Sequence, residues 1–238
     1  MIAILTADLD DLCATLKTML QIDEKDRTES TNFYVSKLCN DSIIFANMGW
    51  QKVEVAKTIA DLNAHYDLTA VIGTNTVASL SCEDAPIGTL GICTNSVQYD
   101  VDYSELGYPV GYLNLLNTVI LKSNQTLVRL ASMAAKKCDF CSHCGKFISA
   151  DQFVASTENA EALQTCYNCE FIDCNAAPLL QMCRFYHIPG VVIGGVSDYA
   201  DDDAVSDYKC NKDAAALAAL ETAVCLAHIL SNRVKKHK

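Results

Sequence analysis

Short runs of β-branched and aliphatic residues alternate with segments of helical periodicity along the whole chain. Such alternation is typical of layered α/β folds and argues against separate all-α and all-β parts. The strands that we expect are Ile2–Thr6, Asn32–Lys37, Ser42–Asn47, Ala70–Thr74, Ile87–Thr94, Val97–Tyr103, Lys146–Ser149, Glu170–Asp173 and Gly190–Val196. The helices that we expect are Asp8–Leu20, Lys52–Tyr66, Asn124–Lys137, Thr157–Thr165, Ala177–Tyr186 and Lys212–Arg233. No repeat, low-complexity linker or cluster of Pro and Gly divides this pattern, so we expect one domain over residues 1–238.

Composition and charge exclude several classes of protein. Half of the residues are hydrophobic and 20% are charged, so a folded core is expected and the disordered class is excluded. A net charge of -11 opposes binding to nucleic acid or to an anionic membrane. The longest candidate for a membrane span, Leu106–Leu121, is interrupted by Gly, Asn and Pro, and no signal peptide is evident at the start. We therefore expect a soluble, cytoplasmic protein.

One acidic residue stands at the end of the clearest strand of the sequence. Gly190–Val196 is a continuous β-branched and glycine run, and Ser197 and Asp198 follow it directly. Ligands of open α/β sheets gather beyond the carboxyl ends of the strands, so Asp198 is a candidate site residue. The alternative is that Asp198 belongs to a solvated acidic loop that runs to Asp203.

Four segments, taken together and in order, resemble the nucleoside phosphorylase superfamily, and within it the 5'-methylthioadenosine/S-adenosylhomocysteine nucleosidases. Ile2–Leu12 is a strand that enters a helix through an acidic turn, and Gln98–Tyr108 is similar to the family's H-D-x-D-x-T-x-x-G-Y stretch. Ser149–Val154 is similar to S-G-D-x-F. The fourth segment pairs Ile172–Ala176, in the place of V-E-M-E-A, with Ile188–Asp198. The resemblance implies a three-layer α/β/α sandwich around a mixed central sheet.

The resemblance also implies catalytic roles for two carboxyl groups. Asp198 falls where the family places the acid that protonates purine N7 as the N-glycosidic bond breaks. A carboxyl group can donate a proton at neutral pH only if burial or a neighbouring carboxylate raises its pKa. Asp11 falls where the nucleosidases place a glutamate that positions water. Its alternative role is ordinary, because an acid in the first turn of a helix complements the helix dipole.

The remaining site residues are assigned by the same resemblance. Phe153 would stack on the purine, while the backbone of Val154 bonds to the edge of the base; the alternative for Phe153 is a plain core aromatic. The other expected contacts with the nucleoside are Met48, Leu106, Tyr108, Asp151, Asp173, Cys174, Asn175 and Ser197. Leu106 and Tyr108 lie in a segment that, in the family, reaches the neighbouring subunit, so a homodimer is implied.

The arginine positions favour hydrolysis over phosphorolysis. Phosphorylases of this superfamily clamp phosphate with arginines, and bidentate recognition of phosphate is a task for which arginine is best suited. The only arginines of the chain are Arg27, Arg129, Arg184 and Arg233, and none lies in a matching loop. We therefore expect a purine nucleosidase that hydrolyses 5'-methylthioadenosine, S-adenosylhomocysteine or a related nucleoside, without a cofactor.

Several departures from the family pattern keep two other functions open. Asn175 stands where the nucleosidases have a glutamate, and Gly194 stands where they usually have an arginine. The segment Asn75–Ser79 replaces a glycine-rich turn, and Met48 replaces a serine or threonine. An amide accepts a hydrogen bond less strongly than a carboxylate does. The alternatives are a non-catalytic protein of the same fold that binds or stores purine nucleosides, and a phosphorylase.

Two C-x-x-C pairs form the strongest isolated motif. Cys141 and Cys144 are followed by Cys166 and Cys169, and paired spacing of this kind is typical of a structural zinc site. The chain has 13 cysteines, however, so such pairs also arise by chance, and buried thiols behave as small hydrophobic groups. Zinc is therefore the minority hypothesis, and we assign no metal ligand.

Overall fold

The computed structural model describes residues 1–7, 24–27, 32–36 and 43–234. The expected helix Asp8–Leu20, and Asp11 with it, lies outside the described residues.

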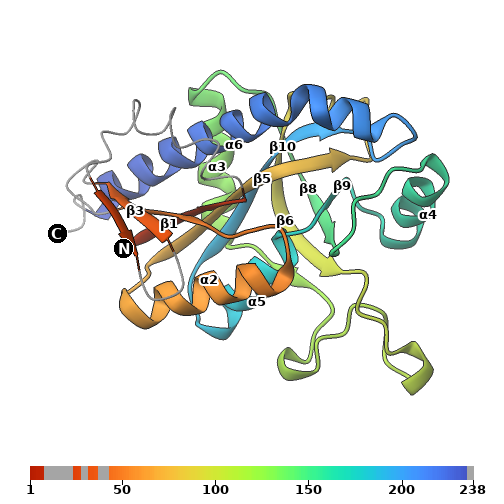
Figure 1. Ribbon diagram of the computed structural model, residues 1–238, viewed down its shortest axis with the longest axis horizontal. Helices are drawn as coiled ribbons and strands as arrows, with labels where there is room; N and C mark the ends of the chain where they lie inside the picture. Colours follow the sequence, from red (N-terminus) through yellow and green to blue (C-terminus); the bar gives the residue numbers. More distant parts are fainter. Residues whose placement is uncertain (8–23, 28–31, 37–42, 235–238) are drawn as a thin grey trace.

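A mixed sheet forms the centre of the molecule (Figure 1). Its strands are β1 (Ile2–Thr6), β2 (Glu24–Arg27), β3 (Asn32–Ser36), β4 (Ile43–Asn47), β5 (Ala70–Ser79), β6 (Leu90–Gln98), β7 (Leu121–Lys122), β8 (Ser142–Ser149), β9 (Phe171–Asp173) and β10 (Gly190–Asp198). The pairing order is β10-β6-β8-β9-β5-β1-β4-β3-β2, with β7 attached to β6. Four strands pair with one another in parallel, in the order β4, β1, β5 and β10, so their carboxyl ends meet at one edge of the sheet.

One end of the sheet closes on itself. β5 pairs with β10, and the path from β10 through β6, β8 and β9 returns to β5. Closure brings the ends of β5, β9 and β10 close together although they are far apart in the sequence. The sequence pattern predicts most of the strands, although not β2 or β7. It does not predict this closure, because the alternation of apolar residues does not specify which strands pair.

Helices cover both faces of the sheet (Figure 1). α3 (Gln125–Lys137) and α6 (Ala204–Val234) pack on one face, whereas α2 (Lys52–His65) and α5 (Ala176–Phe185) pack on the other. α4 (Thr157–Tyr167) lies at the end of the molecule. The predicted three-layer α/β/α arrangement around a mixed sheet is confirmed.

Local chemistry explains where the helices begin. The side chain of Asn124 accepts hydrogen bonds from the backbone N–H groups of Thr126 and Leu127, and so caps α3. Gln51 and Glu54 form a reciprocal capping box at the start of α2. Both caps satisfy backbone donors that an isolated helix would leave without partners.

The structure corrects several predicted boundaries, among them the start of β8, which is Ser142 and not Lys146. β6 is one strand where two were expected, and β5 continues to Ser79 rather than ending at Thr74. α6 begins at Ala204, eight residues before the expected Lys212, because the acidic segment after β10 turns directly into the helix. This extension matters for the site, since it brings Tyr208 onto α6.

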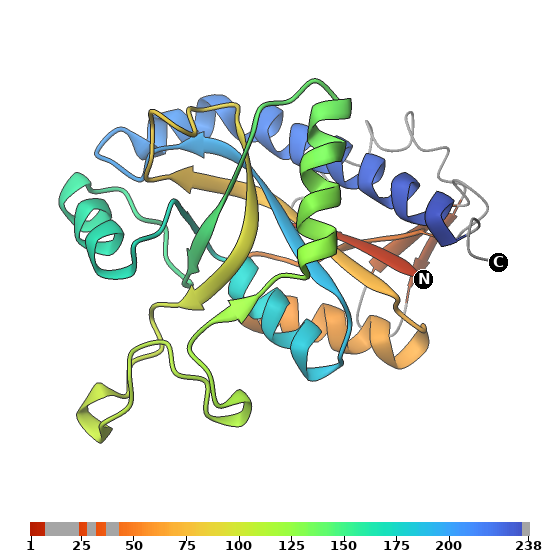
Figure 2. The same ribbon diagram turned by 180° about the vertical axis from the view of Figure 1, so that it is seen from behind.

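α6 is also the helix whose length and composition would allow it to cross a membrane. The qualifying stretch is Ala204–Asn232, and 56% of its apolar window is buried within the molecule. Its alanines and leucines pack against β5, β10 and α3, so the core accounts for its apolar composition. The segment Leu106–Leu121, which is the longest candidate in the sequence, contains short 3-10 turns in an arm that extends from the sheet (Figure 2).

Candidate active site

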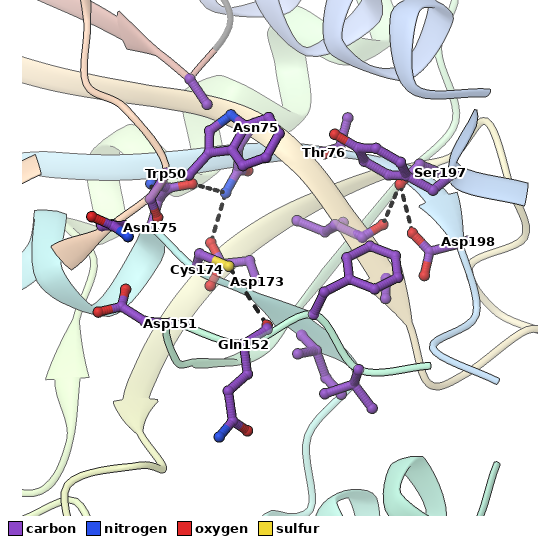
Figure 3. Close-up of a pocket in the computed structure, with 18 residues that line it drawn as sticks. Trp50, Asn75, Thr76, Asp151, Gln152, Asp173, Cys174, Asn175, Ser197 and Asp198 are labelled. Atoms are coloured by element: carbon purple, nitrogen blue, oxygen red, sulfur yellow. Dashed lines mark hydrogen bonds between the residues drawn. The ribbon is translucent and has the colours of Figure 1, made fainter. Parts of the chain in front are cut away.

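A cavity of about 300 Å³ lies at the carboxyl ends of the parallel strands. Its lining comes from residues 50–51, 75–78, 151–154, 172–175 and 197–198, together with Ala7 and Tyr208. Figure 3 shows that Ser197 and Asp198 lie on one side, whereas Asn75, Asp173 and Asn175 lie on the other. No described lining residue is Lys, Arg or His, while three are Asp.

Asp198 ends β10 and is buried, with 2% of its surface exposed. Burial is the main reason that the pKa of its carboxyl group is raised above the ordinary value, and the charges of Asp207 and Asp201 raise it further. Hydrogen bonds from Ser197 and from the backbone N–H of Ala200 act in the opposite direction. The alternative of a solvated loop acid does not fit this position, and the geometry instead gives a carboxyl group that retains its proton to higher pH.

Ser197 can form a hydrogen bond with Asp198 whether Asp198 is protonated or ionised. Its Oγ lies 2.8 Å from Asp198 Oδ2 and 3.4 Å from the backbone oxygen of Val77 (Figure 3). A hydroxyl group has one hydrogen but can also accept. When Asp198 is ionised, Ser197 donates to it. When Asp198 is protonated, Asp198 can donate to Ser197, and Ser197 can donate to Val77. The proton on Asp198 can therefore be lost and regained without leaving a polar group unpaired.

Aromatic rings line a second part of the cavity. Phe153 follows β8, and its ring meets the edge of the Tyr208 ring with centroids 5.5 Å apart. Phe153 is 54% exposed, so it is not the plain core aromatic of the alternative interpretation. An exposed ring that lines a cavity offers a flat surface for a planar ligand. Val154 lies beside it in the lining, so the ring and the backbone expected to contact a base are present together.

The residues Asp173–Asn175, which we call the β9–α5 corner, form the opposite side. Asp173 is buried and accepts hydrogen bonds from Ser149 Oγ at 2.5 Å, Asn75 Nδ2 at 2.7 Å and the Ala176 N–H at 2.8 Å. Burial raises the pKa of Asp173, although these donors oppose the shift. Cys174 lines the cavity with a thiol whose pKa is raised to about 12, mainly by burial, so the thiol is neutral.

The amide of Asn175 is held by the protein itself. Its nitrogen donates to the backbone oxygens of Gly49 at 3.0 Å and Trp50 at 3.3 Å. Its oxygen faces Asn75 Nδ2 at 3.4 Å. Both N–H bonds of Asn175 are therefore used, and only its oxygen remains to accept from a ligand.

Asp151 lies at the mouth of the cavity beside an ion pair. Its carboxylate accepts from the backbone N–H of Lys52 at 3.0 Å, and its own N–H reaches Asp100 at 3.3 Å. Lys52 pairs with Asp100 at 2.6 Å. These bonds join the loop after β8 to the start of α2, and they place Asp151 in a structural role at the rim as well as in the lining.

Comparison with known proteins identifies the family. A family model described as the phosphorylase superfamily matches residues 1–231. This chain belongs to the phosphorylase superfamily.

Relatives of this superfamily chain include two kinds of nucleosidase. The 5'-methylthioadenosine/S-adenosylhomocysteine nucleosidase of Staphylococcus haemolyticus is 24% identical over 205 residues, which cover 86% of this chain and 89% of the relative. The aminodeoxyfutalosine nucleosidase of Campylobacter jejuni is 23% identical over 207 residues, which cover 87% of this chain and 89% of the relative.

Solved structures show the same superfamily fold. The futalosine hydrolase of Helicobacter pylori has a TM-score of 0.88 at 23% identity, with 95% of this chain and 96% of that chain covered. A 5'-methylthioadenosine/S-adenosylhomocysteine nucleosidase of the same organism has a TM-score of 0.87 at 24% identity, with 95% and 97% covered.

Four residues expected from the superfamily resemblance are not in the described lining of the cavity. Met48 is fully buried in the core, where its N–H donates to Thr6. Leu106 and Tyr108 lie in the extended arm, with 73% and 47% of their surfaces exposed. Asp11 lies outside the described residues.

Sequence reasoning missed other lining residues, above all Asn75, Trp50 and Tyr208. In the sequence, Asn75 stands out only as a departure from the glycine-rich turn of the superfamily, and nothing local points to its partners at the β9–α5 corner. Tyr208 belongs to an acidic segment that gave no helical signal of its own. Neither position carries a local pattern that distinguishes a lining residue from an ordinary one.

The two C-x-x-C pairs do not form a metal site. Across the described part of the chain, no three side chains of His, Cys, Asp or Glu are arranged to hold a metal ion. Cys144 contacts Ser132 at 3.2 Å, whereas Cys169 is buried and contacts the backbone oxygen of Leu163 at 3.8 Å. Cys141 and Cys166 are exposed. The eleven described cysteines are free thiols, so the zinc hypothesis is not supported.

Proposed function

We propose that this chain is a purine nucleosidase, an N-glycosyl hydrolase acting on 5'-methylthioadenosine, S-adenosylhomocysteine or a related nucleoside. The single observation that carries the proposal is the buried carboxyl group of Asp198, with a raised pKa, in a cavity that Phe153 also lines. Such a group can remain protonated and donate to a leaving purine. The names of the relatives support the same reaction class.

In the proposed reaction, the bond between the base and the sugar breaks as Asp198 gives its proton to purine N7. The electron pair of that bond leaves with the base, so the protonated base departs neutral. Positive charge develops on the sugar, and water adds its oxygen to the anomeric carbon and releases a proton. Asp198 then regains a proton from solvent. By resemblance, Asp11 would orient the water.

Water is the acceptor in this proposal because the described cavity lining holds no cation. Phosphorolysis requires a bound phosphate dianion, which arginine or lysine side chains normally hold. The described lining instead carries Asp151, Asp173 and Asp198.

The arm that carries Leu106 and Tyr108 supports a homodimer as part of the proposal. Leu115 in the same arm is 86% exposed, and the rings of Tyr108 and Tyr112 stack with centroids 5.1 Å apart. Exposed apolar side chains on a projecting segment are typical of an interface. Light scattering would test this assembly, and a monomer at micromolar concentration would contradict it. A single domain over 1–238 that works in the cytoplasm without nucleic acid or membrane remains part of the proposal.

Release of free adenine tests the function. Purified protein is incubated with 5'-methylthioadenosine, S-adenosylhomocysteine and aminodeoxyfutalosine, and the free base is measured by chromatography. We expect release without phosphate in the buffer and no stimulation when phosphate is added. Phosphate-dependent release would indicate a phosphorylase.

A non-catalytic nucleoside-binding protein is the second candidate, because the Asn175 amide is engaged by Gly49 and Trp50 instead of being free for the ligand. Crystals soaked with 5'-methylthioadenosine separate the two candidates. Intact nucleoside in the cavity would favour binding alone, whereas separated base and sugar would favour the enzyme.

A further inference from the structure

We infer that Asn75 is a positioning residue that fixes the hydrogen-bonding pattern of the β9–α5 corner and thereby sets how the cavity holds the sugar of its ligand. Asn75 lies on β5, lines the cavity and is 4% exposed. Nothing in its own strand explains a buried amide at this place. Its partners lie about 100 positions further along the chain, on β9 and at the start of α5.

The amide of Asn75 supplies the donor that lies between two acceptor oxygens. Asn175 uses both of its N–H bonds on backbone oxygens, so its oxygen is turned towards Asn75. Asp173 Oδ2 also faces the amide nitrogen of Asn75. Without the nitrogen of Asn75, these two acceptors would face each other with no side-chain donor between them. Oxygen atoms so placed repel each other, and one of the two side chains would rotate away.

The oxygen of Asn75 depends on the glycine beside it. Gly194 on β10 is the register partner of Asn75. A Cβ atom at position 194 would lie 3.2 Å from Asn75 Oδ1 and only 2.2 Å from Val77 Cγ1. Asn75 Oδ1 itself is buried and has no hydrogen-bond partner in the described structure. The orientation of the Asn75 amide is therefore set by the two oxygens to which its nitrogen donates. The absence of a side chain at position 194 leaves space for its oxygen.

The consequence concerns ligand recognition at the corner. Asp173 and Asn175 both line the cavity, and Asn75 holds their oxygens in fixed positions. Such oxygens can accept further hydrogen bonds, and acceptors of this kind suit the hydroxyl groups of a sugar. Phe153 and Asp198, which the proposed function assigns to the base, line the other side of the cavity. The inference rests on the proposed function for the identity of the ligand. It predicts that Asn75 affects the sugar part of the affinity and leaves the base part unchanged.

The test compares two ligands on Asn75→Leu, which keeps the size of the side chain and removes its donors. Calorimetry measures the dissociation constants of free adenine and of a 5'-methylthio C-nucleoside of adenine type, whose carbon–carbon glycosidic bond cannot be hydrolysed. We expect the C-nucleoside to bind about tenfold more weakly or worse. Adenine is expected to bind within about twofold of the unmodified protein.

Asn95→Leu is the matched control. Asn95 is a half-buried asparagine on β6 that is not among the described lining residues, and its amide donates to Thr94 at 3.1 Å. We expect it to change neither affinity. If Asn75→Leu does not fold, Asn75→Ala removes the same donors without adding bulk and is read in the same way.

An unchanged ratio of the two affinities in Asn75→Leu would overturn the inference, as would a parallel loss of both. A parallel loss would mean that Asn75 only supports the fold. Failure of the proposed function has a different signature. If the unmodified protein binds neither adenine nor the C-nucleoside, both the function and the inference are overturned. If it binds both but releases no adenine from 5'-methylthioadenosine, only the catalytic claim falls.

Discussion

Replacing Asp198 by Asn removes the proton that the proposed reaction needs and keeps the shape of the side chain. The structure indicates that the variant will fold. An amide oxygen can still accept from the Ala200 N–H, which lies 3.1 Å from Asp198 Oδ1. The amide nitrogen can donate to Ser197 Oγ, which lies 2.8 Å from Oδ2, and Ser197 can then donate to Val77. Every polar group therefore keeps a partner.

The rate of the Asp198→Asn variant should fall only because its general acid is missing. A positioned general acid contributes about a hundredfold to ten-thousandfold in rate, which corresponds to about 3 to 5 kcal/mol of barrier. We expect kcat for adenine release to fall by that factor, while the affinity for adenine changes little because Phe153 remains. The assay is single-turnover release of adenine with protein in excess. A variant that retains more than about a tenth of the rate would refute the role of Asp198.

Asp198→Asn should also change how the free energy of unfolding depends on pH. Folding raises the pKa of Asp198 above its ordinary value of 3.8, so the native state keeps a proton that the unfolded chain releases. The resulting stabilisation is fully present below pH 3.8 and is lost as the pH rises through the raised pKa. Asp198→Asn should therefore remove part of the decline in the free energy of unfolding above pH 3.8. Denaturant titrations with the same pH slope in both proteins would contradict the shift.

Three further predictions concern packing, stacking and thiol chemistry. Gly195→Ala should lower the free energy of unfolding, measured by chemical denaturation, by about 3 kcal/mol or more, because its Cβ would lie 2.1 Å from a backbone oxygen of α6. Gly107→Ala, at a left-handed position with open space around it, should lower the same free energy by only about 1 kcal/mol. Phe153→Leu should raise the KM for a purine nucleoside about tenfold with an unchanged melting temperature, since the ring is half exposed; an unchanged KM would remove the stacking role. Alkylation followed by mass spectrometry at pH 8 should modify exposed Cys166 well before Cys174, whose pKa is raised to about 12. Equal rates would show that the pKa of Cys174 is not raised.

Much of the fold could be predicted because its signals are local. The apolar stripe of α2 lies within one segment, and this helix begins at the predicted Lys52. α3 begins one residue after the predicted Asn124, which caps it. The position of Asp198 at the tip of a strand is local as well. The shift of its pKa is not, since it arises from burial beneath other elements and from Asp207 on α6. No pattern within one segment encodes that environment.

The β9–α5 corner shows the limit of local reasoning most clearly. Asn75 and Asp173 are 98 residues apart, and the hydrogen bond between them exists only because the sheet closes on itself. Read along the sequence, Asn75, Asn175 and Gly194 are three separate departures from a family pattern. In space they form one arrangement, in which a glycine leaves room for one amide and that amide orients its neighbours. A substitution at any of the three must therefore be judged with the other two, because removing the donor, the acceptor or the space disturbs the same set of bonds.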